Sequence, residues 1–269
     1  MNTSLERELR NAVRDQMNYE DRIVQLQKYI NDSKYIVAFT GAGISTESNI
    51  PDFRSSSGLY MKDFDGKSPE QILSGRFFRE KKNKPMFFKF LKTRMNVLIG
   101  REPNRSHKFL ADLEKTGKLK AIVTQNIDNL HNLAGNANVL ELHGNYSKFR
   151  CNSACGFGTE HTCDSFMKQM ETKEIPTCEC GSVIRPSTVL FDECLPDDVF
   201  DKAITECFKA DLLIAIGSTL QVQPAAGLLS ERNKECKLVI INKDTTPYDS
   251  RANLIIRENC GEVFDRIKI

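Results

Sequence analysis

The sequence predicts an α/β protein built on a doubly wound parallel sheet, with a helical insertion and a cysteine-rich module. Short apolar runs typical of buried parallel strands recur along the chain, and helical segments separate most of them. Strands that alternate with helices favour a doubly wound sheet. The length of 269 residues suffices for one large domain and a minor one, with a core that needs no disulfides.

Five apolar runs give the predicted strands, at 35–39, 120–124, 139–142, 212–216 and 238–241. Helices are predicted at 3–30, 106–115, 197–209 and 224–233. The first of these helices begins with a capping box of Thr3 and Glu6, followed by apolar residues at helical spacing.

Two stretches interrupt the alternation and define the expected domains. Residues 55–105 are rich in Phe, Lys and Arg, show no strand pattern and are predicted to be a helical insertion. Residues 149–184 hold the cysteine cluster. The remaining segments, 1–54, 106–148 and 185–269, are expected to form the large domain.

Composition excludes several classes of function. The formal net charge of +2 comes without a concentrated basic stripe, which argues against specific nucleic-acid binding. No apolar run approaches the ~18 residues of a membrane span. The N-terminal region is polar and lacks an apolar signal segment, so we expect a cytoplasmic protein.

Five of the nine cysteines crowd into the middle of the chain, as Cys151, Cys155, Cys163, Cys178 and Cys180. In a reducing compartment this crowding points to a metal site and not to a disulfide framework. The four scattered cysteines are expected to be buried thiols.

A glycine turn follows the first predicted strand. In Gly41-Ala42-Gly43-Ile44-Ser45-Thr46, glycines would let the backbone approach a pyrophosphate at a helix start. Thr46 replaces the third glycine of the usual fingerprint, and no acid-terminated second strand follows, which disfavours an ordinary dehydrogenase. Asp52, Phe53 and Arg54 follow on a loop that starts at a proline; the plainer interpretation is a core Phe53 and a surface Arg54.

Polar residues also follow two later strands. Gln125, Asn126 and Asp128 suit a pocket floor at the carboxyl end of a strand, where α/β sheets place ligands. His143 comes just after the next strand and could act as a general base. A buried core histidine is the alternative for His143, and His107 and His131 are expected to be structural.

Several long motifs, in one order, resemble the sirtuin family over about residues 33–265. They are Gly41-Ala42-Gly43-Ile44-Ser45, Ile50-Pro51-Asp52-Phe53-Arg54, Thr124-Gln125-Asn126-Ile127-Asp128, Leu142-His143-Gly144, Phe191-Asp192-Glu193-x-Leu195-Pro196, Gly217-Ser218-Thr219-Leu220 and Ile241-Asn242. The resemblance implies a Rossmann-like NAD-binding domain and NAD-dependent removal of acyl groups from protein lysines.

The resemblance also implies roles for individual residues. The turn from Gly41 to Thr46, with Ala42, Gly43 and Ser45, would hold the pyrophosphate, and Asp52, Phe53 and Arg54 would lie at the nicotinamide ribose. Gln125 would hold ribose hydroxyls, while Asn126, Ile127 and Asp128 would form the nicotinamide pocket. The residues expected at the adenosine half are Gly217, Ser218, Thr219, Asn242 and Cys260 or a neighbour of it.

The implied reaction consumes NAD. The acyl-lysine oxygen would attack the ribose as nicotinamide leaves, with Asn126 and His143 as catalytic residues and His143 as general base on a ribose hydroxyl. The products would be O-acyl-ADP-ribose and free lysine. The partners would therefore be acyl-lysine peptides or proteins.

The cysteine pairs resemble the zinc ribbon of the same family. Cys151, Cys155, Cys178 and Cys180 would close a tetrahedral structural zinc site, which leaves no position for a catalytic water. Both pairs depart from the usual C-x2-C spacing, so Cys163, or less readily His161, could substitute for one ligand.

The match to the family departs at three places. Asp192 stands where members usually carry glycine in the substrate loop, where it either points to solvent or repels acidic peptides. Leu91 and Arg94 occupy the positions of a Tyr-x-x-Arg pair found in members that prefer acidic acyl groups, so we expect neutral acyl groups. The insertion phenylalanines, among them Phe77 and Phe88, could line an acyl tunnel or simply pack a core.

Two other functions stay open at the level of sequence. One is mono-ADP-ribosyl transfer from the same NAD pocket, and the other is a non-catalytic module that binds NAD or ADP-ribose. The sequence names neither the protein substrates, nor the acyl length, nor the oligomeric state.

Overall fold

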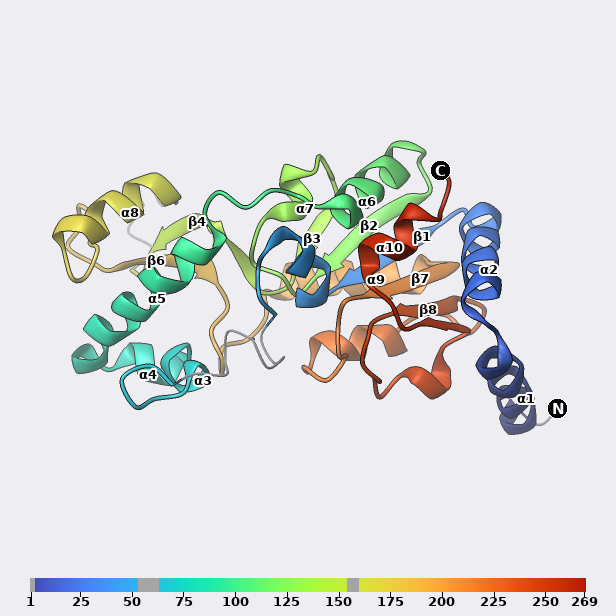
Figure 1. Ribbon diagram of the computed structural model, residues 1–269. Helices are drawn as coiled ribbons and strands as arrows, with labels where there is room; N and C mark the ends of the chain where they lie inside the picture. Colours follow the sequence, from blue (N-terminus) through green and yellow to red (C-terminus); the bar gives the residue numbers. More distant parts are fainter. Residues whose placement is uncertain (1–2, 53–62, 154–159) are drawn as a thin grey trace.

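Six parallel strands form the central sheet of the computed structural model, which describes residues 3–52, 63–153 and 160–269. Their order across the sheet is β3-β2-β1-β7-β8-β9 (Figure 1). The strands are β1 (Ile36–Thr40), β2 (Leu119–Thr124), β3 (Val139–Glu141), β7 (Leu212–Ile216), β8 (Lys237–Ile241) and β9 (Leu254–Ile256). The strand order reverses between β1 and β7, so the predicted doubly wound sheet is confirmed, and its ligand crevice is expected there.

Both faces of the sheet are buried, which explains why its strands are continuous apolar runs. Along β1, Ile36 and Ala38 belong to one hydrophobic core, while Val37 and Phe39 belong to the other. This alternation is the two-residue period of a strand. Each face therefore needs its own layer of helices.

Helices cover the two faces in separate groups. The first core includes residues of α2 (Tyr19–Asp32), α6 (Arg105–Lys115) and α10 (Cys260–Asp265). The second includes residues of α9 (Asp197–Lys209) and the 3-10 helix η3 (Ala225–Ser230). The shorter elements are η1 (Ala42–Ser48), α7 (Leu130–Leu133) and η4 (Asp249–Arg251). We call this sheet with its helices the large lobe.

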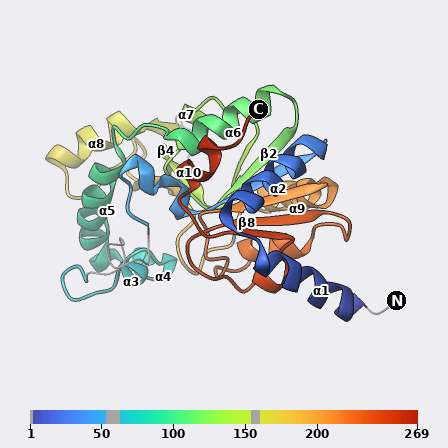
Figure 2. The ribbon, with the colours of Figure 1, turned by 45° about the vertical axis from the view of Figure 1, so that its right-hand side comes forward.

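The predicted helix over 3–30 is wrong as a single element. It divides into α1 (Thr3–Gln16) and α2, because the Asn18 side chain caps the second helix by accepting a hydrogen bond from the Asp21 N–H at 2.9 Å. Arg14 donates to the carbonyls of Asp249 and Ala252, which ties the end of α1 to the large lobe. Figures 1 and 2 show α1 at the N-terminal extremity of the molecule.

Two further differences concern the C-terminal half. The helix predicted over 224–233 is the shorter 3-10 helix η3, and the edge strand β9 was not predicted at all. A run of three apolar residues, Leu254-Ile255-Ile256, is too short to separate from a buried turn by its pattern alone. Pairing with β8 makes it a strand.

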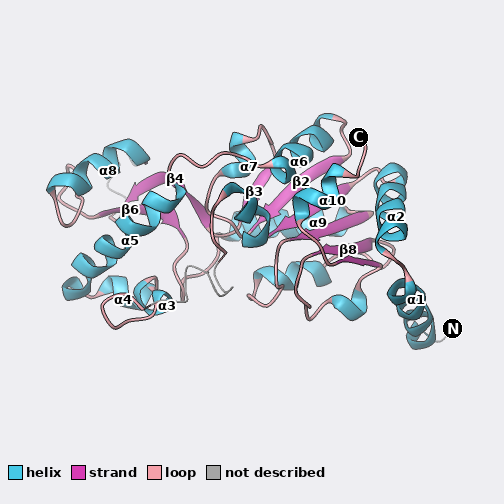
Figure 3. Ribbon diagram, viewed as in Figure 1, coloured by secondary structure: helices cyan, strands magenta, loops and turns pink. Residues whose placement is uncertain are grey.

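A second, antiparallel sheet lies beside the large lobe, with the order β5-β4-β6 (Figure 3). Its strands are β4 (Gly144–Cys151), β5 (Glu160–Thr162) and β6 (Ile184–Thr188). It packs with α3 (Pro69–Ile72), α4 (Gly75–Arg79), η2 (Lys81–Asn83), α5 (Lys84–Leu98) and α8 (Cys163–Thr172). We call this group the small lobe.

One hydrophobic core joins the helical insertion to the cysteine-rich stretch. It contains Phe78, Phe87 and Phe88 of the insertion together with Phe149 and Phe166 of the stretch. The Phe87 and Phe88 rings meet edge to face at 5.3 Å between centroids. These insertion phenylalanines therefore pack a core, which favours that alternative over an acyl tunnel.

Among the residues that the structure describes, no helix has the length and apolar character needed to cross a membrane.

Candidate active site

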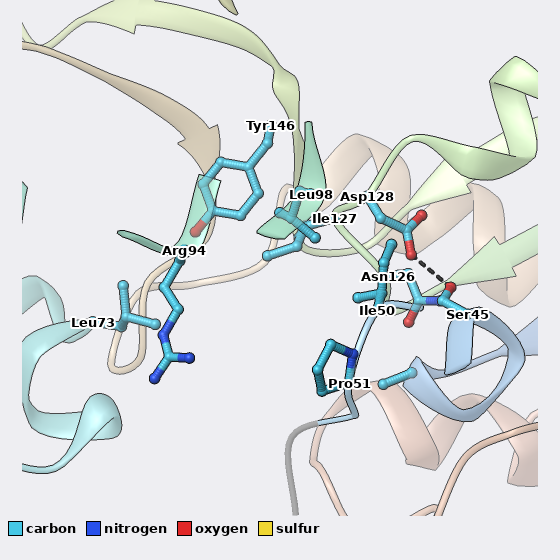
Figure 4. A pocket seen from close by; sticks show the side chains of 11 residues that line it. Ser45, Ile50, Pro51, Leu73, Arg94, Leu98, Asn126, Ile127, Asp128 and Tyr146 are labelled. Atoms are coloured by element: carbon cyan, nitrogen blue, oxygen red, sulfur yellow. Dashed lines mark hydrogen bonds between the residues drawn. The ribbon is translucent and has the colours of Figure 1, made fainter. Parts of the chain in front are cut away.

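A pocket opens at the carboxyl edge of the large sheet, where it meets the small lobe (Figure 4). About 560 Å³ of empty space lies within it, part of it open to solvent. The lining residues are Ala42, Ser45, Ile50, Pro51, Leu73, Arg94, Leu98, Asn126, Ile127, Asp128 and Tyr146. Five residues predicted for the cofactor site line it together, although they come from two separate motifs.

Ser45 connects the two motifs on the floor of this pocket. Its hydroxyl donates to Asp128 Oδ2 at 2.6 Å and accepts from Asn126 Nδ2 at 3.1 Å (Figure 4). Asn126 Nδ2 also donates to the Gly41 carbonyl at 3.1 Å. The glycine turn and the segment after β2 are thereby held as one polar floor.

Asn126 keeps one polar atom for a ligand. Its Oδ1 is buried and has no hydrogen-bond partner in the described parts of the chain. A buried acceptor of this kind costs stability unless a donor meets it. An amide N–H, such as that of a carboxamide, supplies the fitting donor.

Asp128 is held in a mixed environment. Burial raises the pKa of its carboxyl group, while hydrogen bonds from the Ser45 hydroxyl and the Leu130 N–H lower it. Leu130 N donates to Asp128 Oδ1 at 3.0 Å, so both carboxyl oxygens are oriented by the protein. The carboxyl group is thus fixed for accepting from an amide or hydroxyl.

His143 stands between β3 and β4 with a defined tautomer. Its Nδ1 lies 2.9 Å from the Gln125 carbonyl oxygen, which can only accept, so Nδ1 carries the proton. Nε2 is then the free basic nitrogen. Burial lowers the pKa of His143, so the imidazole is neutral near pH 7 and can take up a proton.

Gly144, directly after His143, has a left-handed φ of 66° and lies against β6. A Cβ at this position would come within 1.8 Å of the Ser187 carbonyl oxygen. Only glycine therefore fits beside the histidine, and its backbone can turn into β4 there.

The glycines of the first turn serve chain packing as well as ligand access. A Cβ on Gly43 would lie 2.7 Å from the Gly217 Cα, and a Cβ on Gly217 would lie 2.3 Å from the Ile44 nitrogen. The Gly43 N–H donates to the Gly217 carbonyl at 2.8 Å. The two turns after β1 and β7 thus lock together by direct backbone contact.

Gln125 joins this locked region through its side chain. Ser218 donates its hydroxyl hydrogen to Gln125 Oε1 at 2.9 Å. The residues predicted for the two halves of the cofactor, after β2 and after β7, therefore meet at the crevice where the strand order reverses.

The other residues predicted for the adenosine half lie along the same sheet edge. Thr219 follows Ser218, and Asn242 follows β8, with its Nδ2 donating to the Asp244 carbonyl at 3.0 Å. Cys260 is buried at the first turn of α10. The Glu47 carboxylate accepts from the neighbouring Gly261 N–H at 2.9 Å, which ties α10 to the glycine turn.

Thr46 and Asp52 are placed less tightly. Thr46 is exposed and its hydroxyl donates to the Gly43 carbonyl at 3.0 Å, so it closes the turn. Asp52 is half-buried, one residue beyond the pocket residue Pro51. Phe53 and Arg54, predicted at the ribose, lie outside the described residues.

Three of the four predicted metal ligands come together in the small lobe. The Sγ atoms of Cys151, Cys178 and Cys180 lie within 4.8 Å of one another, and Cys155 lies outside the described residues. Zinc–sulfur bonds of about 2.3 Å in a tetrahedron separate sulfurs by roughly 3.8 Å, so the spacing fits one zinc ion. Cys163 and His161 are described but do not belong to this group.

The substrate loop around Asp192 is anchored to the helical insertion. Asp192 has a left-handed φ of 63°, which explains why glycine is common there. Its exposed carboxylate accepts weakly from the Arg76 N–H at 3.4 Å, and the Gly75 N–H donates to the Phe191 carbonyl at 2.9 Å. The side chain therefore faces both solvent and the start of α4.

Two residues without a predicted role, Tyr146 and Arg185, also shape the site. Tyr146 lines the pocket from β4, with Arg94 of α5 on the same side (Figure 4). Arg185 forms a two-pronged ion pair with Glu193, at 2.9 and 2.8 Å, which fixes the substrate loop. The sequence offered one signal, since Tyr146 breaks the otherwise polar run after Gly144.

The fold and site define a dinucleotide-binding α/β protein whose pocket lies between a large sheet and a small lobe with a cysteine cluster that could hold one zinc ion. A model of the Sir2 family matches residues 41–224. The chain is 43% identical over 250 residues to an NAD-dependent protein deacetylase of Clostridium perfringens, which covers 92% of this chain and 99% of the relative. A relative of the same name from Sulfurisphaera tokodaii is 43% identical over 242 residues, with 88% and 92% of the two chains covered.

Solved structures of Sir2 proteins are similar to this chain as well. A Sir2 complex with a p53 peptide and NAD+ has a TM-score of 0.80 at 37% identity, covering 90% of this chain and 95% of the other. A Sir2 protein bound to a propionylated peptide also has a TM-score of 0.80, at 36% identity, covering 91% and 96%. The chain belongs to the Sir2 family.

Proposed function

We propose that this protein removes acyl groups from protein lysines, consuming NAD and releasing nicotinamide and O-acyl-ADP-ribose. The observation that carries the proposal is the pocket in which Ser45, Asn126 and Asp128 form one polar floor. Relatives that match nearly the whole chain bear the name NAD-dependent protein deacetylase. The unpartnered acceptor of Asn126 suits the carboxamide of nicotinamide.

Different residues along the carboxyl edge of the sheet would bind different parts of NAD. The turn from Gly41 to Thr46 would bind the pyrophosphate through groups other than the N–H groups of Gly41, Gly43 and Ile44, which already donate within the chain. Ser218, Thr219 and Asn242 would bind the adenosine half. When bound, NAD supplies the ribose carbon that receives the acyl oxygen as nicotinamide leaves. Asn126 and Asp128 hold the carboxamide end in place for that departure.

His143 then acts on a ribose hydroxyl. Its Nδ1–H is occupied by the Gln125 carbonyl, so Nε2 accepts the hydroxyl proton. The lowered pKa keeps Nε2 unprotonated near pH 7. A general base of this kind contributes about 10²–10⁴-fold to a rate.

The substrates proposed are acyl-lysine peptides of proteins. Similar solved proteins hold acetylated and propionylated peptides, which are neutral acyl groups. Leu91, at the position of the tyrosine in the acid-preferring pattern, is buried in the small-lobe core and does not line the pocket. We therefore retain acetyl and other neutral acyl groups as the preferred substrates.

The proposed domains are NAD binding for residues 1–54, 106–148 and 185–269, a helical insertion at 55–105, and a zinc module at 149–184. Separate hydrophobic cores support the division between the NAD-binding part and the rest, whereas the helical insertion and the zinc module share one core. The strands β4 and β6 cross the proposed bounds at 148 and 185. Zinc is assigned a structural role, since Cys151, Cys178 and Cys180, with Cys155 as the expected fourth ligand, would leave no coordination site for a water. Reduced thiols in such a site favour the cytoplasm as the compartment.

The experiment is an incubation of purified protein with NAD and acetyl-, butyryl-, succinyl- and myristoyl-lysine peptides. Mass spectrometry reads nicotinamide and free lysine peptide, and the His143→Ala variant is the control. Equimolar release of nicotinamide and deacylated peptide, lost in the variant, supports the proposal. Nicotinamide without deacylation would instead indicate ADP-ribosyl transfer or NAD hydrolysis, and NAD binding without either product would indicate a binding module.

A further inference from the structure

Two buried histidines lie behind the pocket and take no part in the reaction described above. The rings of His107 and His131 are 4.8 Å apart between centroids and tilted by 58°. Both side chains are almost completely buried. Each ring has one nitrogen in a hydrogen bond and one buried nitrogen with no partner in the described chain.

His131 begins a hydrogen-bonded chain that ends at the pocket. Its Nε2 lies 2.9 Å from Thr40 Oγ1, and the Thr40 hydroxyl donates to Thr124 Oγ1 at 2.8 Å. Thr124 Oγ1 accepts from the Asn126 N–H at 3.0 Å. Thr40 and Thr124 are register partners at the last residues of β1 and β2, so rigid strands carry the chain.

The direction of these bonds fixes the tautomer of His131. Thr40 has a single hydroxyl hydrogen, which it donates to Thr124, so its oxygen accepts from His131. His131 must therefore carry its proton on Nε2. Burial lowers the pKa of both histidines, that of His107 to about 4, so both rings are neutral near pH 7.

His107 reaches the other wall of the same pocket. Its Nδ1 lies 2.9 Å from Asn104 Oδ1, and Asn104 Nδ2 donates to the Ile44 carbonyl at 2.7 Å. Ile44 precedes Ser45, which bonds both Asn126 and Asp128. The histidine pair thus sits between two chains of hydrogen bonds that end on the two segments of the pocket floor.

On the basis of the proposed function, we propose that His131 is a positioning residue for the nicotinamide end of the pocket. Through the hydroxyls of Thr40 and Thr124 it holds the Asn126 backbone, while the tilted ring of His107 packs against its own ring. His131 touches no ligand itself. Its loss should therefore disturb the carboxamide subsite and leave the binding of the ADP-ribose half intact.

The variants separate the hydrogen bond from the packing. His131→Phe keeps a ring of similar size and removes the Nε2–H donor, whereas His131→Gln retains an amide N–H at the corresponding distance from the backbone. Thr40→Val cuts the chain at its middle with little change in volume. Ser106→Ala is the matched control, because Ser106 is buried on α6 beside His107 with its hydroxyl outside the chain.

The measurement compares NAD with ADP-ribose, which lacks nicotinamide, by calorimetric binding to each variant. Losing one buried hydrogen bond is expected to weaken NAD binding about tenfold in His131→Phe and in Thr40→Val. ADP-ribose affinity should change less than about twofold, and His131→Gln should recover most of the loss. The double variant His131→Phe/Thr40→Val should bind NAD no more weakly than either single variant, because both substitutions break the same chain of hydrogen bonds.

Three results would each overturn the positioning role. They are equal losses of affinity for NAD and ADP-ribose, additive losses of NAD affinity in the double variant, and unchanged NAD binding in the single variants. Inhibition by free nicotinamide gives a second readout and should weaken in parallel with NAD binding. If the unmodified protein binds NAD without deacylating any peptide, the proposed function fails while the binding comparison still decides the role of His131. If it binds no NAD, both ideas are lost.

Discussion

The two lobes differ in the residues that form and stabilise their cores. The large lobe buries continuous apolar strands on both faces, so the buried polar side chains of these strands, Thr40 and Thr124, lie at strand ends. The small lobe has a three-stranded antiparallel sheet, a cluster of phenylalanines and a set of thiols suited to zinc. The polar residues of the site therefore lie where the large sheet ends, and the small lobe supplies the opposite wall of the pocket.

The largest expected effect comes from the large lobe. His143→Ala should lower kcat by about 10²–10⁴-fold, because it removes the general base. The melting temperature and zinc content should stay unchanged, since His143 belongs to none of the three hydrophobic cores. Steady-state deacylation with an acetyl-lysine peptide measures the effect, and a loss below tenfold would argue against the assigned role.

The lowered pKa of His143 also predicts how activity depends on pH. The neutral imidazole is the active form, and burial lowers its pKa from the ordinary 6.5, so activity should persist to lower pH than an exposed histidine allows. The acid limb of kcat/KM should have its midpoint below 6.5. A midpoint at or above that value would contradict the proposed environment of His143.

The next prediction tests whether the small lobe depends on metal. Cys178→Ser should release zinc and lower the melting temperature by roughly 5 °C or more. Binding of acyl-lysine peptide should weaken more than binding of NAD, because the substrate loop packs on the small lobe. Zinc is measured by elemental analysis, with Cys194→Ser as the control, because Cys194 is exposed and the prediction that it is a buried thiol was wrong. Equal behaviour of the two variants would remove the distinction between the lobes.

A further prediction concerns the pocket wall that the small lobe forms. Arg94 lines it beside Tyr146, and burial raises the pKa of Tyr146 to about 12, so its hydroxyl remains a donor. Arg94→Leu should reduce turnover of succinyl-lysine about tenfold while acetyl-lysine turnover changes less than about threefold. Parallel assays on both peptides measure the ratio, and equal losses would mean that Arg94 serves only packing.

The smallest effect is expected at the substrate loop. Asp192→Asn keeps a residue that tolerates left-handed backbone but removes the charge. Turnover of acidic peptides relative to basic ones should rise about two- to threefold, and added salt should shrink the difference. Peptide pairs that differ in flanking charge provide the measurement, and an unchanged ratio would show that the Asp192 charge does not reach the substrate.

Prediction from the sequence succeeded where the pattern was long and local. Five of the six strands of the parallel sheet and the helix 197–209 follow directly from apolar runs and helical spacing. Three predicted cysteine ligands also come together, as their crowding in the middle of the chain indicated. The break at Asn18, the strand β9 and the antiparallel sheet were missed, since capping and pairing partners decide them.

The sequence by itself determined the α/β class, the Sir2 resemblance and the polar segments that end the strands. Tertiary structure alone decided that Gly43 and Gly217 lock by backbone contact, that Tyr146 and Arg94 share a pocket wall, and that His131 reaches Asn126 through two threonines. The physical reason is that periodicity records which face of an element is buried, whereas these contacts join residues distant along the chain. Such contacts depend on strand register and lobe packing, which no local pattern encodes.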